Sequence, residues 1–203
     1  MRKFIIIVVI LLIFFGVGGY LYYQQSSKPI GEQVAQKNEA FFVKGDVLCK
    51  KSGRDEWSGL DRDSSLADGD MIETSKNSSV EIKFGKDMKN IISAREDTSI
   101  KLDVIVASGD KKITLAKGKF LADLEELDSG SKFEVVTPTA VCGVLGTGFE
   151  TVTSPDTTTV KVYDGQVHVK SAGMRGMISK PVIVSQGSQV VIPKSKAPEQ
   201  PVP

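Results

Sequence analysis

Apolar and polar residues alternate along most of the chain between residues 41 and 192. The segment "SSVEIKF", for example, places Val80, Ile82 and Phe84 between polar neighbours. Alternation with a period of two is typical of β-strands that bury one face, and Gly, Asp, Ser and Asn separate the runs. The pattern predicts about ten to twelve short strands.

Helical periodicity is almost absent from the same region. Only residues 118–127 have weak helical spacing, and Gly118 and Phe120 could equally continue a strand. Without long amphipathic helices, alternating βαβ units are excluded. The sequence therefore predicts a single all-β domain of short strands, built either as a twisted β-solenoid or as a jelly-roll or sandwich.

The N-terminus has a different pattern. Arg2 and Lys3 precede residues 4–23, which contain no charged residue. As a helix this segment would span about 30 Å, the thickness of the hydrocarbon core of a bilayer. We expect an uncleaved transmembrane anchor over residues 1–23, with the basic end in the cytoplasm and the rest of the chain outside it. A cleavable signal peptide ending near Val17-Gly18-Gly19 is the alternative.

Composition divides the remainder into three parts. Residues 24–40 are polar and contain Pro29, so we expect a stalk. Residues 41–192 hold the alternating pattern and form the expected β-domain. Residues 193–203 contain four prolines and no aromatic residue, and are expected to be disordered or extended.

Charge gives little support for a nucleic-acid partner. The chain has 26 basic and 25 acidic residues, with a net charge of +1. Both signs alternate and no basic run is long enough to follow phosphates, so nucleic-acid binding is not expected.

Catalytic and metal-binding residues are sparse. The single histidine, His168, lies on the polar side of an alternating segment and is expected to be exposed rather than catalytic. Residues 61–70 contain four aspartates but lack the spacing of an EF-hand loop, so an acidic turn is favoured over a weak Ca²⁺ site. Trp57 is expected to pack on a loop. The sequence predicts no catalytic centre, metal site or cofactor.

Cys49 and Cys142 are the two cysteines, 93 positions apart. An extracytoplasmic domain permits a disulfide between them. Two buried free thiols are an equal or better interpretation, because sequence does not give the geometry of the pair.

The stretch "TPTAVCGVLGTGFETV", residues 137–152, has three glycines within a strand-like run: Gly143, Gly146 and Gly148. It has neither the G-x-G-x-x-G order of a dinucleotide site nor the lysine of a Walker loop. Glycine in a strand pattern indicates a bulge, a corner or close backbone approach. We therefore expect these glycines to shape the backbone.

The same stretch resembles the signature of the FecR-type periplasmic domain, T-P-T-A-V-x-G-V-R-G-T-x-F. The matching residues are Thr137, Pro138, Thr139, Ala140, Val141, Gly143, Val144, Gly146, Thr147 and Phe149. Residues 45–48, 66–84 and 158–169 resemble other strands of that family. Leu145 stands where the family commonly has arginine, and Cys142 is unusual at its position.

The resemblance implies a bacterial inner-membrane protein with one membrane pass and an extracytoplasmic domain of a family associated with signalling and protein contacts. FecR-type regulators of sigma factors have a cytoplasmic domain before the membrane helix, whereas only Met1–Lys3 precede it here. The sigma-regulating activity is therefore not carried over.

Our main hypothesis is a non-catalytic sensing or protein-binding module, with an unidentified protein partner in the cell envelope. The alternative is a structural protein that binds wall or surface polysaccharide. An enzyme acting on polysaccharide through Glu125 and Glu126 ranks last, because adjacent strand residues point to opposite faces.

Overall fold

The fold is all-β, as the alternating pattern predicts. The computed structural model describes residues 38–84, 89–105, 110–125, 132–144, 146–172 and 180–203. These residues form sixteen strands and no helix. In the described part of the chain, no helix is long and apolar enough to cross a membrane. The expected anchor over residues 1–23 lies outside the described residues.

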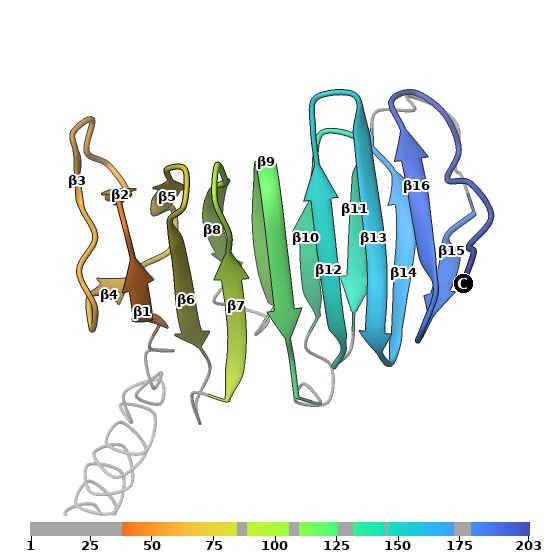
Figure 1. Ribbon diagram of the computed structural model, residues 1–203, viewed down its shortest axis with the longest axis horizontal. Coiled ribbons are helices and arrows are strands. Elements are labelled where there is room, and N and C mark those ends of the chain that lie inside the picture. Colours follow the sequence, from red (N-terminus) through yellow and green to blue (C-terminus); the bar gives the residue numbers. More distant parts are fainter. Residues whose placement is uncertain (1–37, 85–88, 106–109, 126–131, 145, 173–179) are drawn as a thin grey trace, which may run out of the picture. The chain divides into compact units, whose positions relative to one another are not determined.

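The strands form two layers that pack face to face (Figure 1), an architecture like a sandwich. In spatial order, the front sheet consists of β4 (Ser65–Leu66), β1 (Asn38–Lys44), β6 (Ser79–Phe84), β7 (Asn90–Ala94), β9 (Asp110–Asp123), β12 (Gly148–Thr153), β13 (Thr157–Asp164) and β16 (Gln189–Pro193). The back sheet consists of β3 (Trp57–Gly59), β2 (Val47–Lys50), β5 (Met71–Thr74), β8 (Ser99–Ile105), β9, β10 (Phe133–Val136), β11 (Ala140–Val144), β14 (Gln166–Ser171) and β15 (Val182–Ser185). Neither sheet closes into a barrel.

Strand β9 belongs to both sheets. Its first half pairs with β8 and β10, and its second half pairs with β7 and β12. The change of sheet occurs at Gly118, where φ is +100°. A Cβ on Gly118 would lie 2.3 Å from the hydroxyl of Thr98, so both the backbone angle and the space require glycine. The weakly helical pattern of 118–127 is therefore a strand as far as Asp123.

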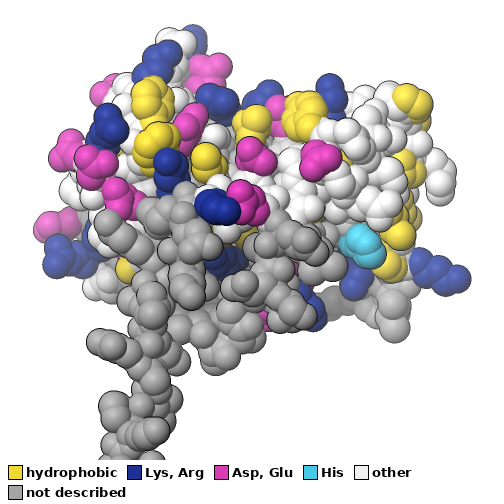
Figure 2. Space-filling model, turned by 90° about the horizontal axis from the view of Figure 1, so that it is seen from below, with side chains coloured by type: hydrophobic (Ala, Val, Ile, Leu, Met, Phe, Trp, Pro, Cys, Tyr) yellow, Lys and Arg dark blue, Asp and Glu magenta, His cyan; other side chains and the backbone are white. Residues whose placement is uncertain are grey.

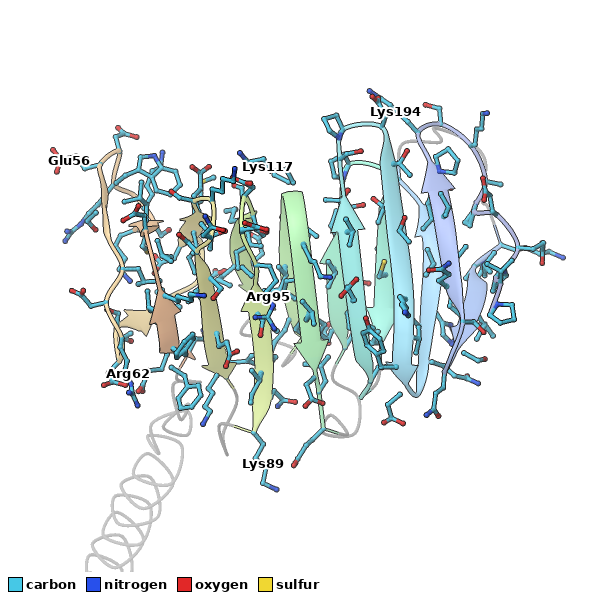
Figure 3. The ribbon with its side chains drawn as sticks, viewed as in Figure 1. Glu56, Arg62, Lys89, Arg95, Lys117 and Lys194 are labelled. Atoms are coloured by element: carbon cyan, nitrogen blue, oxygen red, sulfur yellow. The ribbon has the colours of Figure 1, made fainter. Side chains whose placement is uncertain are left out.

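The core lies between the two sheets and follows the period of two. Val167 and Val169 of β14 are buried, whereas Gln166, His168 and Lys170 alternate with them on the outer face. Phe84 of the front sheet stacks on Phe133 of the back sheet, with ring centroids 5.7 Å apart. Burial of such aromatic and aliphatic side chains is the main stabilising contribution to a sandwich of this kind. Charged side chains such as Glu56, Arg62, Lys89 and Lys194 project outward instead (Figure 3).

Both ends of the domain differ from the expected boundaries. Strand β1 begins at Asn38, inside the segment that we expected to be a stalk. The Pro-rich segment 193–203, expected to be disordered or extended, runs beside β16: Val202 and Gln189 exchange backbone hydrogen bonds of 2.9 and 2.7 Å, and Glu199 N–H donates to Val191. The free edge of β16 provides hydrogen-bond partners for the backbone of this segment.

Candidate functional site

A groove on the outer face of the back sheet is the strongest candidate for a functional site. It lies over β10, β11 and β14, beside the family signature, and has a volume of about 550 Å³. Its lining includes Lys132, Glu134, Val141, Gly143, Gly146, Gln166, His168, Lys170 and Pro181. Figure 2 shows the single histidine at the surface.

Strand register explains why these residues meet. Gly143 of β11 lies opposite Glu134 of β10 on one side and His168 of β14 on the other. Val141, two residues earlier, lies opposite Lys170. Residues directly opposite each other in a sheet project from the same face. Glu134, Gly143 and His168 therefore form one row across the groove.

Gly143 forms the floor of the groove, but its backbone conformation does not require glycine. Its φ is not among the positive values, and a Cβ built there would meet only the carbonyl oxygen of His168, at 4.0 Å. Neither backbone strain nor crowding therefore requires glycine at this position. Our expectation that Gly143 shapes the backbone is not supported, and its visible consequence is an open groove floor.

Gly146, by contrast, does shape the backbone. Its φ is +98°, in a region that residues with a side chain rarely adopt. Gly165 packs against it, because a Cβ on Gly165 would lie 3.1 Å from the carbonyl oxygen of Gly146 and from the methyl group of Thr147. The hydroxyl of Thr147 donates to the carbonyl of Gln166 at 3.3 Å. This corner connects β11 to β12 and fixes one end of the groove.

Two of the three signature threonines, Thr137 and Thr139, belong to a buried cluster of hydroxyl groups. The hydroxyls of Thr137, Thr139 and Thr153 all lie 2.7–2.8 Å from the hydroxyl of Thr158, in the fully buried end of the sandwich. Thr137 also accepts hydrogen bonds from the backbone N–H groups of Thr139 and Ala140, which closes the turn around exposed Pro138. A hydroxyl has one donor and two acceptor positions, so Thr158 is saturated by its three neighbours. The cluster joins the back sheet to the front sheet.

Phe149, the last signature residue, belongs to the core. It is 1% exposed and its ring centroid lies 6.3 Å from that of Phe120. Leu145, which replaces the family arginine, lies outside the described residues.

The groove has an excess of positive charge. Lys132 and Lys170 lie at its rim with Glu134 as the acidic residue of the lining, and no ion pair to these three is found among the described residues. Other lysines of the same face are already paired: Lys101 lies 2.6 Å from Asp103, and Lys50 lies 3.8 Å from Asp55.

Among the residues that the structure describes, the other candidate catalytic and metal-binding residues are not brought together in one site. His168 is exposed, as expected for a strand histidine. Glu125 pairs with Lys89 at 3.1 Å, and Glu126 lies outside the described residues. Trp57, which we expected to pack on a loop, belongs to the edge strand β3, lies opposite Lys50 and is 38% exposed. The described ranges contain no group of three or more His, Cys, Asp or Glu placed to hold a metal ion.

The acidic segment 61–70 ends in a buried carboxylate with a structural role. Asp70 is 1% exposed and accepts hydrogen bonds from Lys51 Nζ, Ser52 N–H and Ala67 N–H at 2.8–3.0 Å. Burial alone would raise the pKa of Asp70, but the hydrogen bonds from Lys51 and the two backbone groups outweigh it and lower the pKa. These donors occupy both carboxylate oxygens, which favours a structural role over a Ca²⁺ site.

The disulfide between Cys49 and Cys142 is not formed. Both thiols are free and buried. Cys49 lies in β2 and Cys142 in β11, with β5, β8, β9 and β10 between them in the back sheet. Five steps of about 4.8 Å separate the strands, whereas a disulfide needs Cα atoms within about 7 Å. Burial raises the pKa of Cys142 to about 12, and burial is also the main reason that the pKa of Cys49 is raised.

Sequence reasoning missed the charged rim of the groove. Lys132, Glu134 and Lys170 carry no motif, and Lys132 and Lys170 are 38 positions apart in the chain. Their only sequence signal is their place on the polar side of strands that flank the signature. Pairing of β10 with β11 and of β11 with β14 brings them together.

The sequence also matches a known protein family. Residues 70–168 match the family model described as FecR protein. This part of the chain is a FecR-type domain, which confirms the resemblance of the signature. No curated protein matches the chain.

Solved structures show the same fold. Two crystal structures of a candidate anti-sigma factor from Parabacteroides distasonis ATCC 8503 match with a TM-score of 0.51 and 16% sequence identity. Each match covers 64% of this chain and 59% of the Parabacteroides chain, so this chain corresponds to only part of that protein.

Proposed function

We propose that this chain is a membrane-anchored, extracytoplasmic regulatory module that binds a protein partner and has no catalytic activity of its own. The observation that carries the proposal is the FecR-type domain, whose signature strand β11 forms the floor of an accessible groove. The fold shared with a candidate anti-sigma factor supports a regulatory role. The apolar segment 4–23 supports the anchor.

Site-specific photo-crosslinking in native membranes tests the protein-binding part of this proposal. Benzoylphenylalanine replaces Ile183, which lies opposite His168 beside the groove and is 50% exposed. The matched control replaces Tyr163, which is 47% exposed on the front sheet. We expect a discrete protein adduct from position 183 and none from position 163. Absence of an adduct at position 183, or identical adducts at both positions, would contradict binding at this face.

The anchor is tested separately by membrane fractionation. The full chain is expected to stay with the membrane after extraction with alkaline carbonate and to leave it only in detergent. Release by carbonate alone would show that residues 4–23 do not span the bilayer.

A further inference from the structure

The groove has a chemistry that the family assignment does not specify. We propose that it binds a carboxylate-bearing segment of polypeptide from the partner, which lies across β10, β11 and β14 over Gly143. This inference rests on the proposed protein-binding function and names the partner chemistry at its site.

The dimensions of the groove fit a short peptide segment. From Glu134 across Gly143 to His168 there are two strand spacings, or about 10 Å. The volume of about 550 Å³ lies within the range of ligand-binding clefts, which is roughly 300–1,000 Å³. The groove therefore accommodates a few residues of extended chain.

The charges of the rim select an acidic segment. Lys132 and Lys170 flank the groove, and Glu134 is the acidic residue among the described residues of its lining. Lys132 and Lys170 are therefore the lysines of this lining that can bind an incoming carboxylate. Exposed cations of this kind contribute selectivity and faster association more than affinity.

Apolar contacts and hydrogen-bonding groups complete the site. Val141 is half-buried in the groove, and Ile183 extends the apolar surface beside His168. Gln166 and His168 add polar groups that can bind backbone or side-chain atoms of the segment. The surface thus fits a segment in which acidic and apolar residues alternate.

Gly143 determines whether the segment can enter. A larger residue here would project from the outer face into the groove, because its inward neighbours are Cys142 and Val144. The open space around a Cβ at this position means that the fold tolerates such a residue. A substitution at Gly143 should therefore weaken binding without lowering the stability of the fold.

The test uses the full chain in nonionic detergent and a fluorescein-labelled hexapeptide that alternates glutamate with valine. A counterpart with glutamine in place of glutamate measures the contribution of charge. Fluorescence anisotropy is recorded for the wild type, for Gly143→Leu and for the double variant Lys132→Glu, Lys170→Glu. Gly59→Leu is the matched control, because Gly59 lies in the same sheet on β3 and its Cβ would have no neighbour within 4 Å. Circular dichroism melting accompanies each variant.

We expect the acidic peptide to bind the wild type and the Gly59→Leu control. Gly143→Leu should weaken binding more than about tenfold, and the charge reversal about three- to tenfold, without loss of melting temperature. Equal binding of both peptides, absence of binding, or full affinity in Gly143→Leu would overturn the inference. If the crosslink from position 183 persists while the acidic peptide fails to bind, the partner chemistry is wrong and the proposed function stands.

Discussion

The hydroxyl oxygens of Thr158 and Thr137 lie 2.8 Å apart and connect the two sheets in the buried end of the sandwich. Thr137 is a signature residue of the FecR-type domain, whereas Thr158 lies 21 positions later, on β13. Thr158 is also the common neighbour of the hydroxyls of Thr139 and Thr153. The conformation of the signature turn therefore depends on a residue outside the signature.

Thr158→Val should destabilise the domain by about 2–3 kcal/mol, because it leaves three buried hydroxyls without their shared partner. The matched control is Thr151→Val on β12. Thr151 is equally buried, but its hydroxyl has no hydrogen-bond partner, so the same change should leave stability unchanged or raise it by up to about 1 kcal/mol. Urea unfolding of both variants measures the difference, and equal destabilisation would show that the hydroxyl cluster contributes nothing specific.

Gly146→Val should lower the free energy of unfolding by about 1–3 kcal/mol, because φ at this residue is +98°. Gly143→Val should not lower it, and could raise it by about 0.5–1 kcal/mol, because glycine within a strand weakens the strand. Thermal melts of the two variants provide the comparison. A destabilised Gly143→Val would mean that packing, rather than access to the groove, requires this glycine.

Asp70 should make stability depend on acid pH. Its pKa in the folded protein is lower than the unfolded value of about 3.9, so the ionised carboxylate stabilises the fold above that pH. The stabilisation is then lost as the pH falls through the folded pKa. Asp70→Asn should cost about 2 kcal/mol at neutral pH, since hydrogen bonds to a charged group are lost.

Urea titrations between about pH 2 and pH 7 test this dependence, with the range set by the reference pKa of aspartate. The difference in stability between the wild type and Asp70→Asn should shrink as the solution becomes more acidic. A difference that is constant across the range would exclude the ionised carboxylate as its cause.

Both cysteines should be unreactive toward thiol reagents at pH 8 in the folded protein. Each is buried, and the pKa of Cys142 is raised to about 12, so almost no thiolate is accessible. After unfolding without reductant, both thiols should react. If no thiol reacted under those conditions, the cysteines would be linked and the separation of β2 and β11 would be wrong.

The alternating pattern was sufficient to predict the fold class and the faces of individual strands. Val167 and His168 illustrate this, because their burial and exposure follow from a period of two. The pairing order could not be predicted, since it depends on contacts between distant segments. The parallel pairing of β9 with β10 and the sharing of β9 leave no local pattern.

Local composition could not decide between two states of the tail. The prolines of 193–203 predicted a disordered or extended segment, and the backbone of Val202 and Glu199 forms hydrogen bonds with β16. Gly143 and Gly146 belong to one motif and share one residue type, yet only the latter has a positive φ. Dihedral angles cannot be read from a sequence, so the difference between these two glycines became visible only in the structure.

The position of β9 in both sheets has a consequence for unfolding. In a β-solenoid each rung contacts only its neighbours, so rungs can unfold from one end while the others persist. Here one strand provides central pairings to both layers, to β8 and β10 through its first half and to β7 and β12 through its second. We therefore expect the two layers to unfold together, in one cooperative transition.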